Sequence, residues 1–273
     1  MPTEIALQDI TNGTNGLSYA FYRSVMSRLA DAEVPFLVGG AYALAYYTTL
    51  QRNTKDFDLF VRKTDIERAL AALTGGHCTT ELTFPHWLGK AVSGEDFVDI
   101  IFSSGNGVAV VDDEWFTHAP TTQVLGMDAK LSPPEEMIWS KAFIMERERY
   151  DGADVMHVFL RCGATLDWPR LLRRFGEHWR VLLSHVVMFG FVYPAERASI
   201  PAWVADQLMA RLQTEQNEVP QTGRLCRGPL LSRAQYLIDI EEWGYEDARL
   251  GPAGVMSDSE VAQWTAAISD RGG

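Results

Sequence analysis

Two aspartates two positions apart, Asp56 and Asp58, have the residue types and spacing most suggestive of chemistry in this sequence. Side chains two residues apart on a strand point to the same face, so both carboxylates would project together. The alternating apolar residues Phe57, Leu59 and Val61 would then enter the core. Carboxylates held close together repel each other, and such a pair either shares a proton or binds a hard cation such as Mg²⁺. The segment therefore predicts a negatively charged pocket.

Two consecutive glycines, Gly39 and Gly40, precede this pair and follow an apolar run at 35–38. Glycine lets the backbone turn tightly, and the following segment, 41–50, has the length of a helix. Amides at a helix N-terminus attract phosphate. The glycines therefore predict a phosphate-binding turn between a short strand and a helix.

A third carboxylate, Asp99, lies within the apolar run 97–102, whose other residues favour a strand. Each feature also has a plain structural explanation. A Gly-Gly pair is most often a turn, an Asp-x-Asp string is most often a solvated strand face, and a lone Asp between apolar residues can belong to an edge strand. Their order along the chain favours the functional interpretation.

That order resembles the nucleotidyltransferase superfamily that includes DNA polymerase beta. The family pattern is Gly-Gly or Gly-Ser after a strand, then a helix, Asp-x-Asp or Asp-x-Glu on the next strand and a third acidic residue on a later strand. The matching positions here are Gly39, Gly40, Asp56, Asp58 and Asp99. The string RNTKDFDL at 52–59 is similar to the bacterial branch of abortive-infection nucleotidyltransferase toxins, and the resemblance covers about residues 34–162.

The resemblance implies an α/β (α+β) fold, with a nucleotidyltransferase-like mixed β-sheet flanked by helices in a catalytic domain at 1–130. A mainly helical C-terminal region, 131–273, would complete the nucleotide cleft. The implied activity is metal-dependent transfer of a nucleoside monophosphate from a nucleoside triphosphate (NTP) to an acceptor hydroxyl, with release of pyrophosphate. Two Mg²⁺ ions would take part.

The same resemblance implies roles for individual residues. The expected ligands of the two Mg²⁺ ions are Asp56, Asp58 and Asp99, and the last of these would also help to deprotonate the acceptor. The expected nucleotide-binding residues are Gly39, Gly40, Arg52 and Thr54. Two of these have simpler alternatives, since Arg52 could be an ordinary loop cation and Thr54 a turn residue.

Lys141 is the remaining candidate, on a helix predicted over 134–147 with Ser132 as its cap. It lies on or beside the apolar face of that helix, and an inward lysine needs an anionic partner. The resemblance places it near the nucleotide phosphates, with Asp151 or Asp154 capping the next helix and orienting it. The alternative is a surface lysine whose stem covers apolar groups. In the functional interpretation, Lys141→Met would weaken triphosphate binding and change stability little.

The acceptor stays open among a tRNA end, a small molecule such as an antibiotic and a protein side chain. Two departures from the family pattern are the long gap between Gly40 and Asp56 and a Gly where a Ser hydroxyl would bind phosphate. A toxin, a housekeeping enzyme and a resistance enzyme all fit the pattern. A non-catalytic nucleotide- or partner-binding module on the same fold is the alternative function, and the pattern leaves the oligomeric state open.

Composition limits the other possibilities. The 273 residues carry a net charge of -12, which argues against a broad, non-specific nucleic-acid surface. Three distant cysteines support neither a disulfide framework nor a zinc site and favour a reducing compartment. The N-terminus lacks a signal-peptide pattern, and the apolar stretches are shorter than the ~20 residues of a spanning helix, so we expect a soluble cytoplasmic protein with no membrane partner.

Hydrophobic periodicity and turn residues predict the remaining elements. Further helices are expected at 17–32, 65–73, 154–162, 168–175 and 179–191. Further strands are expected at 79–84, 87–92, 97–103 and 122–125, the last closing the sheet, with a hairpin turn at 93–96. The arginines at 170, 173, 174 and 180 are interpreted as a solvated helix face.

Overall fold

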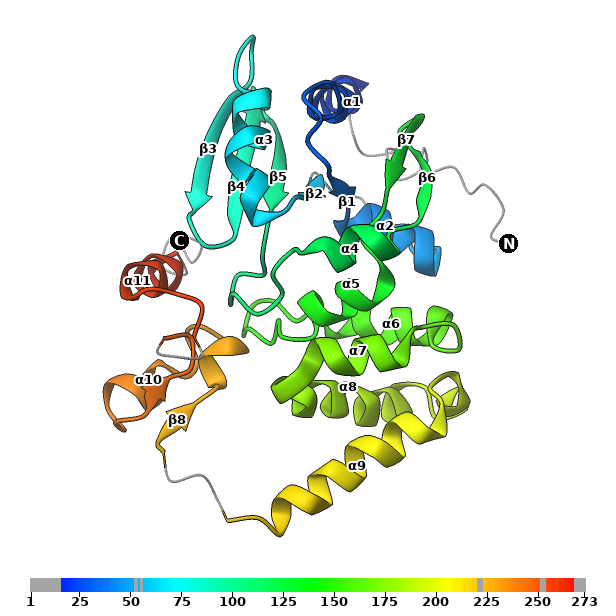
Figure 1. Cartoon of the computed structure of the whole chain (residues 1–273), viewed down its shortest axis with the longest axis vertical. Coiled ribbons are helices and arrows are strands. Elements are labelled where there is room, and N and C mark those ends of the chain that lie inside the picture. The colour runs from blue at the N-terminus through cyan, green and yellow to red at the C-terminus, as the bar shows by residue number, and fades with distance from the viewer. Residues whose placement is uncertain (1–15, 52–53, 55, 220–222, 251–253, 268–273) are drawn as a thin grey trace. The chain divides into compact units, whose positions relative to one another are not determined.

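The computed structural model describes residues 16–51, 54, 56–219, 223–250 and 254–267 (Figure 1). The chain forms two compact units that divide between Pro133 and Pro134. The first contains a mixed β-sheet with flanking helices, and the second is mainly helical. The predicted fold class is therefore confirmed.

The sheet of the first unit has five strands in the order β1-β2-β5-β4-β3. Strands β2 and β5 are parallel, whereas the other neighbours are antiparallel, so the sheet is mixed. The strands are β1 (Leu37–Val38), β2 (Asp58–Phe60), β3 (Thr79–Phe84), β4 (Leu88–Ser93) and β5 (Asp96–Ile101). The parallel pair is the one that joins the two segments bearing the predicted catalytic aspartates.

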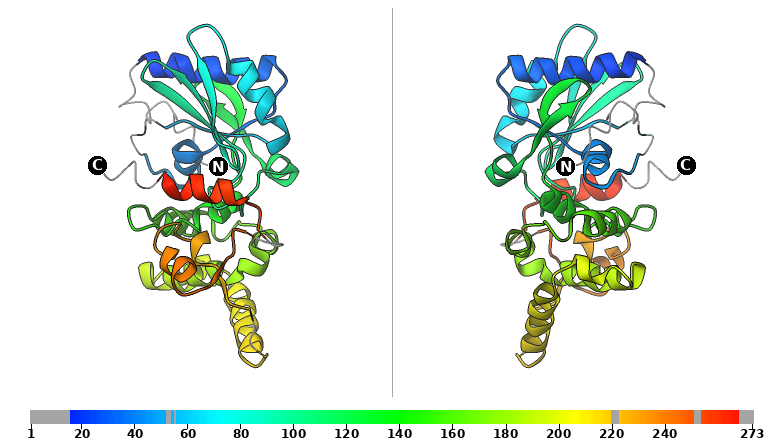
Figure 2. Two further views of the ribbon diagram at one scale, coloured as in Figure 1. Left: turned by 90° about the vertical axis from the view of Figure 1, so that its left-hand side faces the viewer. Right: turned by 90° about the vertical axis from the view of Figure 1, so that its right-hand side faces the viewer.

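Apolar side chains of β2 and β5 form the core on one face of this sheet. Phe57, Leu59 and Val61 have no exposed surface, as the alternation in the sequence predicted. Helix α1 (Gly16–Asp31) contributes Tyr22, whose ring stacks on Phe57 with centroids 4.7 Å apart. Helix α3 (Ile66–Leu73) packs beside α1 and against β3 and β4 (Figure 2). With these apolar residues in the core, the intervening residues Asp58 and Phe60 face the other way.

The predicted strand at 122–125 forms, but it does not close the sheet as expected. It becomes β6 (Thr121–Val124), which pairs with β7 (Met127–Lys130) in a separate two-stranded sheet. The reason is the turn between them, where Leu125 and Gly126 both have positive φ, of 51° and 71°, and reverse the chain at once. The short helix α4 (Asp113–His118) was also not predicted; the Asp112 side chain caps it by accepting from Glu114 N.

In the second unit, helix α5 packs against α6 and α7, and α8 packs against α6, α7 and α9 (Figure 1). Their bounds are Pro134–Lys141, Gly152–Cys162, Trp168–Phe175, Trp179–Val192 and Ala202–Gln216. The unit also contains α10 (Leu237–Glu241), α11 (Asp258–Ala266) and the strands β8 (Leu225–Cys226) and β9 (Glu246–Asp247). No helix in the described part of the chain has the length and apolar character needed to cross a membrane.

Helix α5 ends at Lys141, well before residue 147, where its predicted end lay. The backbone after it forms other hydrogen bonds: Met145 N donates to Leu231 O at 3.1 Å, and Asp151 N donates to Ile144 O at 3.1 Å. The Ser132 hydroxyl, predicted to cap the helix, has no hydrogen-bond partner. Pro133 and Pro134 follow it and have no N–H to donate.

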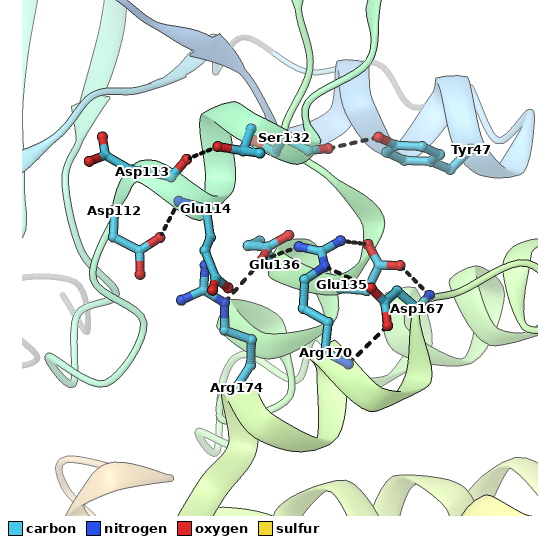
Figure 3. Close-up of polar contacts among 11 residues, drawn as sticks. Tyr47, Asp112, Asp113, Glu114, Ser132, Glu135, Glu136, Asp167, Arg170 and Arg174 are labelled. Carbon is cyan, nitrogen blue, oxygen red and sulfur yellow. Dashed lines mark hydrogen bonds and ion pairs between the residues drawn. The ribbon is translucent and has the colours of Figure 1, made fainter.

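A buried ion network connects α5 with α7, where the sequence suggested a solvated arginine face (Figure 3). Arg170 is only 3% exposed and forms ion pairs with Glu135 and, at 2.5 Å, with Glu136. Arg174 Nε lies 3.1 Å from the same Glu136 oxygen. Burial raises the pKa of Glu136 above its usual value, although the arginines oppose this shift. The interpretation as a solvated face is wrong for Arg170, because its guanidinium neutralises two buried carboxylates.

Candidate functional site

Asp58 and Asp99 occupy the same register position on the parallel strands β2 and β5. Register partners on adjacent strands lie side by side and project from the same face. Hydrogen bonds from Asp99 N to Phe57 O, 3.0 Å, and from Val61 N to Ile101 O, 2.9 Å, fix this pairing at both ends of β2. Both side chains are partly exposed, so the sheet presents two neighbouring carboxylates on one face.

The Gly39-Gly40 turn packs directly against this acidic strand. Gly39 N donates to the Asp58 carbonyl at 2.9 Å. Gly40 has a φ of +52°, and a Cβ atom at this position would lie 1.8 Å from Oδ2 of Asp58. A Cβ on Gly39 would lie 2.1 Å from the Phe60 ring. Glycine is therefore required at both positions by close approach, and at Gly40 also by backbone conformation.

Helix α2 (Gly40–Thr48) starts at this turn, beside Asp58. Gly39 is its N-cap residue and provides no side-chain cap, while Ala43 N donates to Gly39 O at 3.1 Å. The first N–H groups of a helix have no acceptor within the helix, and the helix dipole favours an anion there. The turn thus combines backbone donors for phosphate with a carboxylate that could hold a cation.

Asp56 lies before β2, in an exposed position. Its backbone N–H donates to Thr54 Oγ1 at 3.0 Å, so Thr54 acts as a turn residue that fixes the approach to the strand. Burial raises the pKa of Tyr22 to about 12, with further contributions from the negative charges of Asp96 and Asp56. Arg52 lies outside the described residues, and its predicted phosphate contact stays a prediction.

Lys90, which the sequence did not single out, forms an ion pair with Asp99. The two residues are register partners across β4 and β5, and their side chains are 26% and 18% exposed. The hairpin turn predicted at 93–96 was sufficient to predict that positions 90 and 99 pair. Counting back from paired residues 93 and 96 along antiparallel strands places position 90 opposite position 99.

Asp58 and Asp99 are chemically suitable for Mg²⁺, which prefers carboxylate oxygens. Among the residues that the structure describes, no three His, Cys, Asp or Glu side chains are grouped as a metal site. Asp56 is exposed outside the strand, and one oxygen of Asp99 is bound by Lys90. The two-carboxylate pair fits a cation, while the predicted ligation of two ions by three aspartates stays a prediction.

Lys141 belongs to the second unit, where it is held by two aspartates. Its Nζ lies 2.8 Å from Asp151 Oδ2 and 2.9 Å from Asp154 Oδ2, and its side chain is 17% exposed. Burial lowers the pKa of Lys141, but the two carboxylates outweigh burial and raise it above its ordinary value. The ammonium is thus an internal counter-ion and does not extend along the surface to solvent. Its predicted contact with nucleotide phosphates stays a prediction.

Comparison with known proteins gives structural matches only. No protein-family model and no curated protein matches the chain. It is similar to the antibiotic-resistance factor ANT(2'')-Ia in solution, at 14% identity over 63% of this chain and 98% of that chain, with a TM-score of 0.44. It is also similar to the lincosamide antibiotic adenylyltransferase LnuA bound to lincomycin, at 14% identity over 51% and 94% of the two chains, with a TM-score of 0.37.

A third similar structure is ANT(2'')-Ia in complex with adenylyl-2''-tobramycin, at 15% identity over 73% of this chain and 99% of that chain, with a TM-score of 0.34. These neighbours are nucleotidyltransferases, the superfamily that the sequence resembles. They do not single out the abortive-infection branch, which stays a prediction.

Proposed function

We propose that this protein is a metal-dependent nucleotidyltransferase that moves a nucleoside monophosphate from an NTP to an acceptor hydroxyl. The observation that supports this proposal most is the contact between the Gly39-Gly40 turn and the acidic pair Asp58 and Asp99. A helix N-terminus that attracts phosphate lies beside β2, whose Asp58 forms with Asp99 of β5 a pair of carboxylates that attract a cation. A metal-bound triphosphate needs both kinds of group.

The residues that would hold Mg²⁺ are Asp58 and Asp99, with Asp56 as the third ligand that the family resemblance implies. When bound, Mg²⁺ neutralises phosphate charge and lowers the pKa of a coordinated hydroxyl. The metal would balance negative charge on both the carboxylates and the triphosphate.

The transfer step can be written with the chain's own groups. The acceptor oxygen forms a bond to the α-phosphorus, and the bond from that phosphorus to the bridging oxygen of pyrophosphate breaks. The hydroxyl proton passes to the Asp99 carboxylate, and pyrophosphate leaves with the bonding electron pair. The Gly39 and Gly40 turn orients the phosphates through backbone amides, which cost no reorganisation during the reaction.

Three further residues keep the roles implied by the family resemblance. Arg52 and Thr54 are proposed to contact the nucleotide near the acidic pair, and Lys141 is proposed to neutralise its phosphates. The hydrogen bond from Asp56 N to Thr54 Oγ1 gives Thr54 a structural task in addition. Each proposal concerns charge neutralisation or positioning, and no covalent enzyme intermediate is required.

The acceptor belongs to one of three classes: a tRNA end, a small molecule or a protein side chain. The competing proposal is a nucleotide- or partner-binding module without turnover. The two carboxylates on one face of the sheet favour an enzyme. Carboxylates held close together repel each other, and a metal cofactor bound between them would relieve this repulsion. The competing module would bind nucleotide without releasing pyrophosphate.

The deciding experiment supplies each labelled NTP with Mg²⁺ and one acceptor class at a time: total RNA, total protein, or antibiotics including tobramycin and lincomycin. We expect label to move to one class and pyrophosphate to appear in equal amount. The control is Asp58→Asn, which keeps the side-chain shape and removes the charge. Nucleotide binding without label transfer or pyrophosphate would instead support the binding module.

A further inference from the structure

Charged residues form a row across four strands on the face of the sheet that presents Asp58. Strand pairing places Glu81 of β3 opposite Lys90 of β4, Lys90 opposite Asp99 of β5, and Asp99 beside Asp58 of β2. Register partners share a face, so the charges follow one another as negative, positive, negative, negative. Lys90 is the only cation in this row of described residues.

Contacts on two sides hold the Lys90 ammonium in place. It forms an ion pair with Asp99 Oδ1 and lies 4.4 Å from the centroid of the Phe97 ring. Phe97 is two residues before Asp99 on the same strand and so projects from the same face. An aromatic ring attracts an ammonium through its negative face, which adds to the ion pair. The lysine is therefore positioned at the carboxylate and is not an unconstrained surface cation.

Two neighbouring carboxylates without a cation repel each other, and this repulsion opposes folding. An ammonium paired with one of them removes much of the repulsion. A divalent cation that binds the same carboxylates meets that ammonium as a competitor, because both need the Asp99 oxygens and like charges repel.

We propose that Lys90 is a positioning residue that holds the Asp99 carboxylate in the cation-free protein and competes with a divalent cation for it. The competition sets the cation concentration at which the site fills. This inference rests on the proposed function, since it requires that Asp58 and Asp99 bind a cation. Lys90 leaves Asp99 when the cation arrives, and the exposed Glu81 on the next strand is a carboxylate available to receive it.

The test measures binding of Mn²⁺ alone, without nucleotide, to the full chain stripped of divalent ions, by electron paramagnetic resonance of the free Mn²⁺. We expect Lys90→Met to bind Mn²⁺ about tenfold more tightly than wild type, which corresponds to about 1.4 kcal/mol. This is the size of the repulsion in water between a singly charged ammonium and a doubly charged cation a few ångströms apart. Lys90→Arg should behave as wild type. Lys63→Met removes an equal charge at an exposed position of the same unit and should leave the affinity unchanged.

A thermal melt provides the second readout. Without divalent ions, Lys90→Met should melt below wild type, because the Asp99 carboxylate loses its ion pair with the Lys90 ammonium. Saturating Mn²⁺ should remove that difference, since ligand binding to the folded state stabilises it. A lysine with a purely structural role would give the same deficit with and without Mn²⁺.

A second variant covers the case in which Lys90→Met does not fold. Glu81→Gln alters an exposed residue and removes the carboxylate that would receive Lys90 after it leaves Asp99. Lys90 should then compete more strongly for Asp99, and we expect Mn²⁺ affinity to fall about twofold. Glu67→Gln, also exposed in the first unit, controls for the loss of one negative charge. Equal effects of these two variants would count against the proposal.

The outcomes separate the two proposals. If Asp58→Asn weakens Mn²⁺ binding while Lys90→Met leaves it unchanged or weaker, competition by Lys90 is refuted and the proposed cation site stands. If neither wild type nor any variant binds Mn²⁺, both proposals fail. Binding by Lys90→Met at concentrations where wild type binds none would support both.

Discussion

The Asp58 carboxylate lies where a side chain on Gly40 would begin. A Cβ atom at position 40 would be 1.8 Å from Oδ2 of Asp58, and the backbone there has a φ of +52°. The turn that exposes amides to a phosphate and the carboxylate suited to a cation are thus in direct contact. Any residue larger than glycine at position 40 would move the carboxylate that the proposed chemistry uses.

We therefore expect Gly40→Ala to reduce Mn²⁺ and nucleotide binding strongly, because the Asp58 carboxylate must move away from the new methyl group. An alanine held in the left-handed conformation of position 40 should also lower the free energy of unfolding by about 1 to 2 kcal/mol. Gly76→Ala is the matched control: its φ is +66°, and no atom lies within 4 Å of a Cβ there. Urea denaturation should show similar destabilisation for both variants, and calorimetry should show a binding defect only for Gly40→Ala. Equal binding by both would show that Asp58 has no such role.

Asp58→Ala should abolish the Mg²⁺-dependent change in melting temperature caused by nucleotide and leave the fold intact. The Lys90–Asp99 ion pair remains in this variant, so a carboxylate that repels Asp99 is lost while its counter-ion stays. The melting temperature without Mg²⁺ should therefore be equal to or higher than that of wild type. If wild type itself shows no shift with any triphosphate, both the enzyme and the nucleotide-binding module lose support.

Local sequence patterns predicted much of the structure around the site, although β2 begins at Asp58 and the prediction that Asp56 shares this strand is wrong. The alternation at 57, 59 and 61 placed three apolar residues in the core, and strand β3 has the predicted bounds. The hairpin at 93–96 also set the register that brings Lys90 to Asp99, although the sequence did not single out that lysine. These features depend on neighbours in the chain or on one short turn.

Other features depend on contacts between distant segments, which residue periodicity does not reveal. The buried Arg170 pairs with Glu136, which lies 34 positions earlier in the sequence. Because the sequence does not show this distant partner, the charge of Arg170 was interpreted as part of a solvated helix face. Residues 122–125 had the composition of a strand, but the positive φ of Leu125 and Gly126 directed them into a separate hairpin. Lys141 needed an anion, as the sequence indicated, yet the identity of that anion depended on the chain path after the end of α5.

Arg170→Met should destabilise the protein by about 3 to 5 kcal/mol, because it leaves two buried carboxylates, Glu135 and Glu136, without their main counter-ion. Arg173→Met is the control on the same helix, since Arg173 is exposed. Urea denaturation monitored by tryptophan fluorescence measures both. A similar, small effect of the two substitutions would show that the network contributes little to stability.

Lys141→Met should also reduce stability by about 3 kcal/mol or more, which changes the expectation from sequence that stability would change little. The ammonium bridges two carboxylates, Asp151 and Asp154, and removing it leaves both partly buried without that charge. Arg161→Met, an exposed substitution on α6, serves as the control in urea denaturation. Triphosphate affinity is measured separately by calorimetry on folded protein. If affinity is unchanged, the role of Lys141 is confined to this ion pair.

The lowered pKa of Asp151 should make the stability of the protein depend on pH. Burial alone would raise its pKa, but the hydrogen bond from Arg149 and the charges of Lys141 and Arg149 lower it from 3.8 to about 2. A lowered pKa in the folded state stabilises the protein above the unfolded-state pKa, and this stabilisation is lost as the pH falls from about 4 to about 2.

Wild type should therefore exceed Asp151→Asn by about 2.5 kcal/mol of unfolding free energy at pH 7, since each pKa unit corresponds to about 1.4 kcal/mol. The difference should shrink between pH 4 and pH 2. Asp206→Asn, an exposed substitution on α9, should retain the wild-type pH dependence. Urea denaturation at pH 7, 4 and 3 tests this, and a constant difference between wild type and Asp151→Asn would show that Arg149 and Lys141 do not lower the pKa of Asp151.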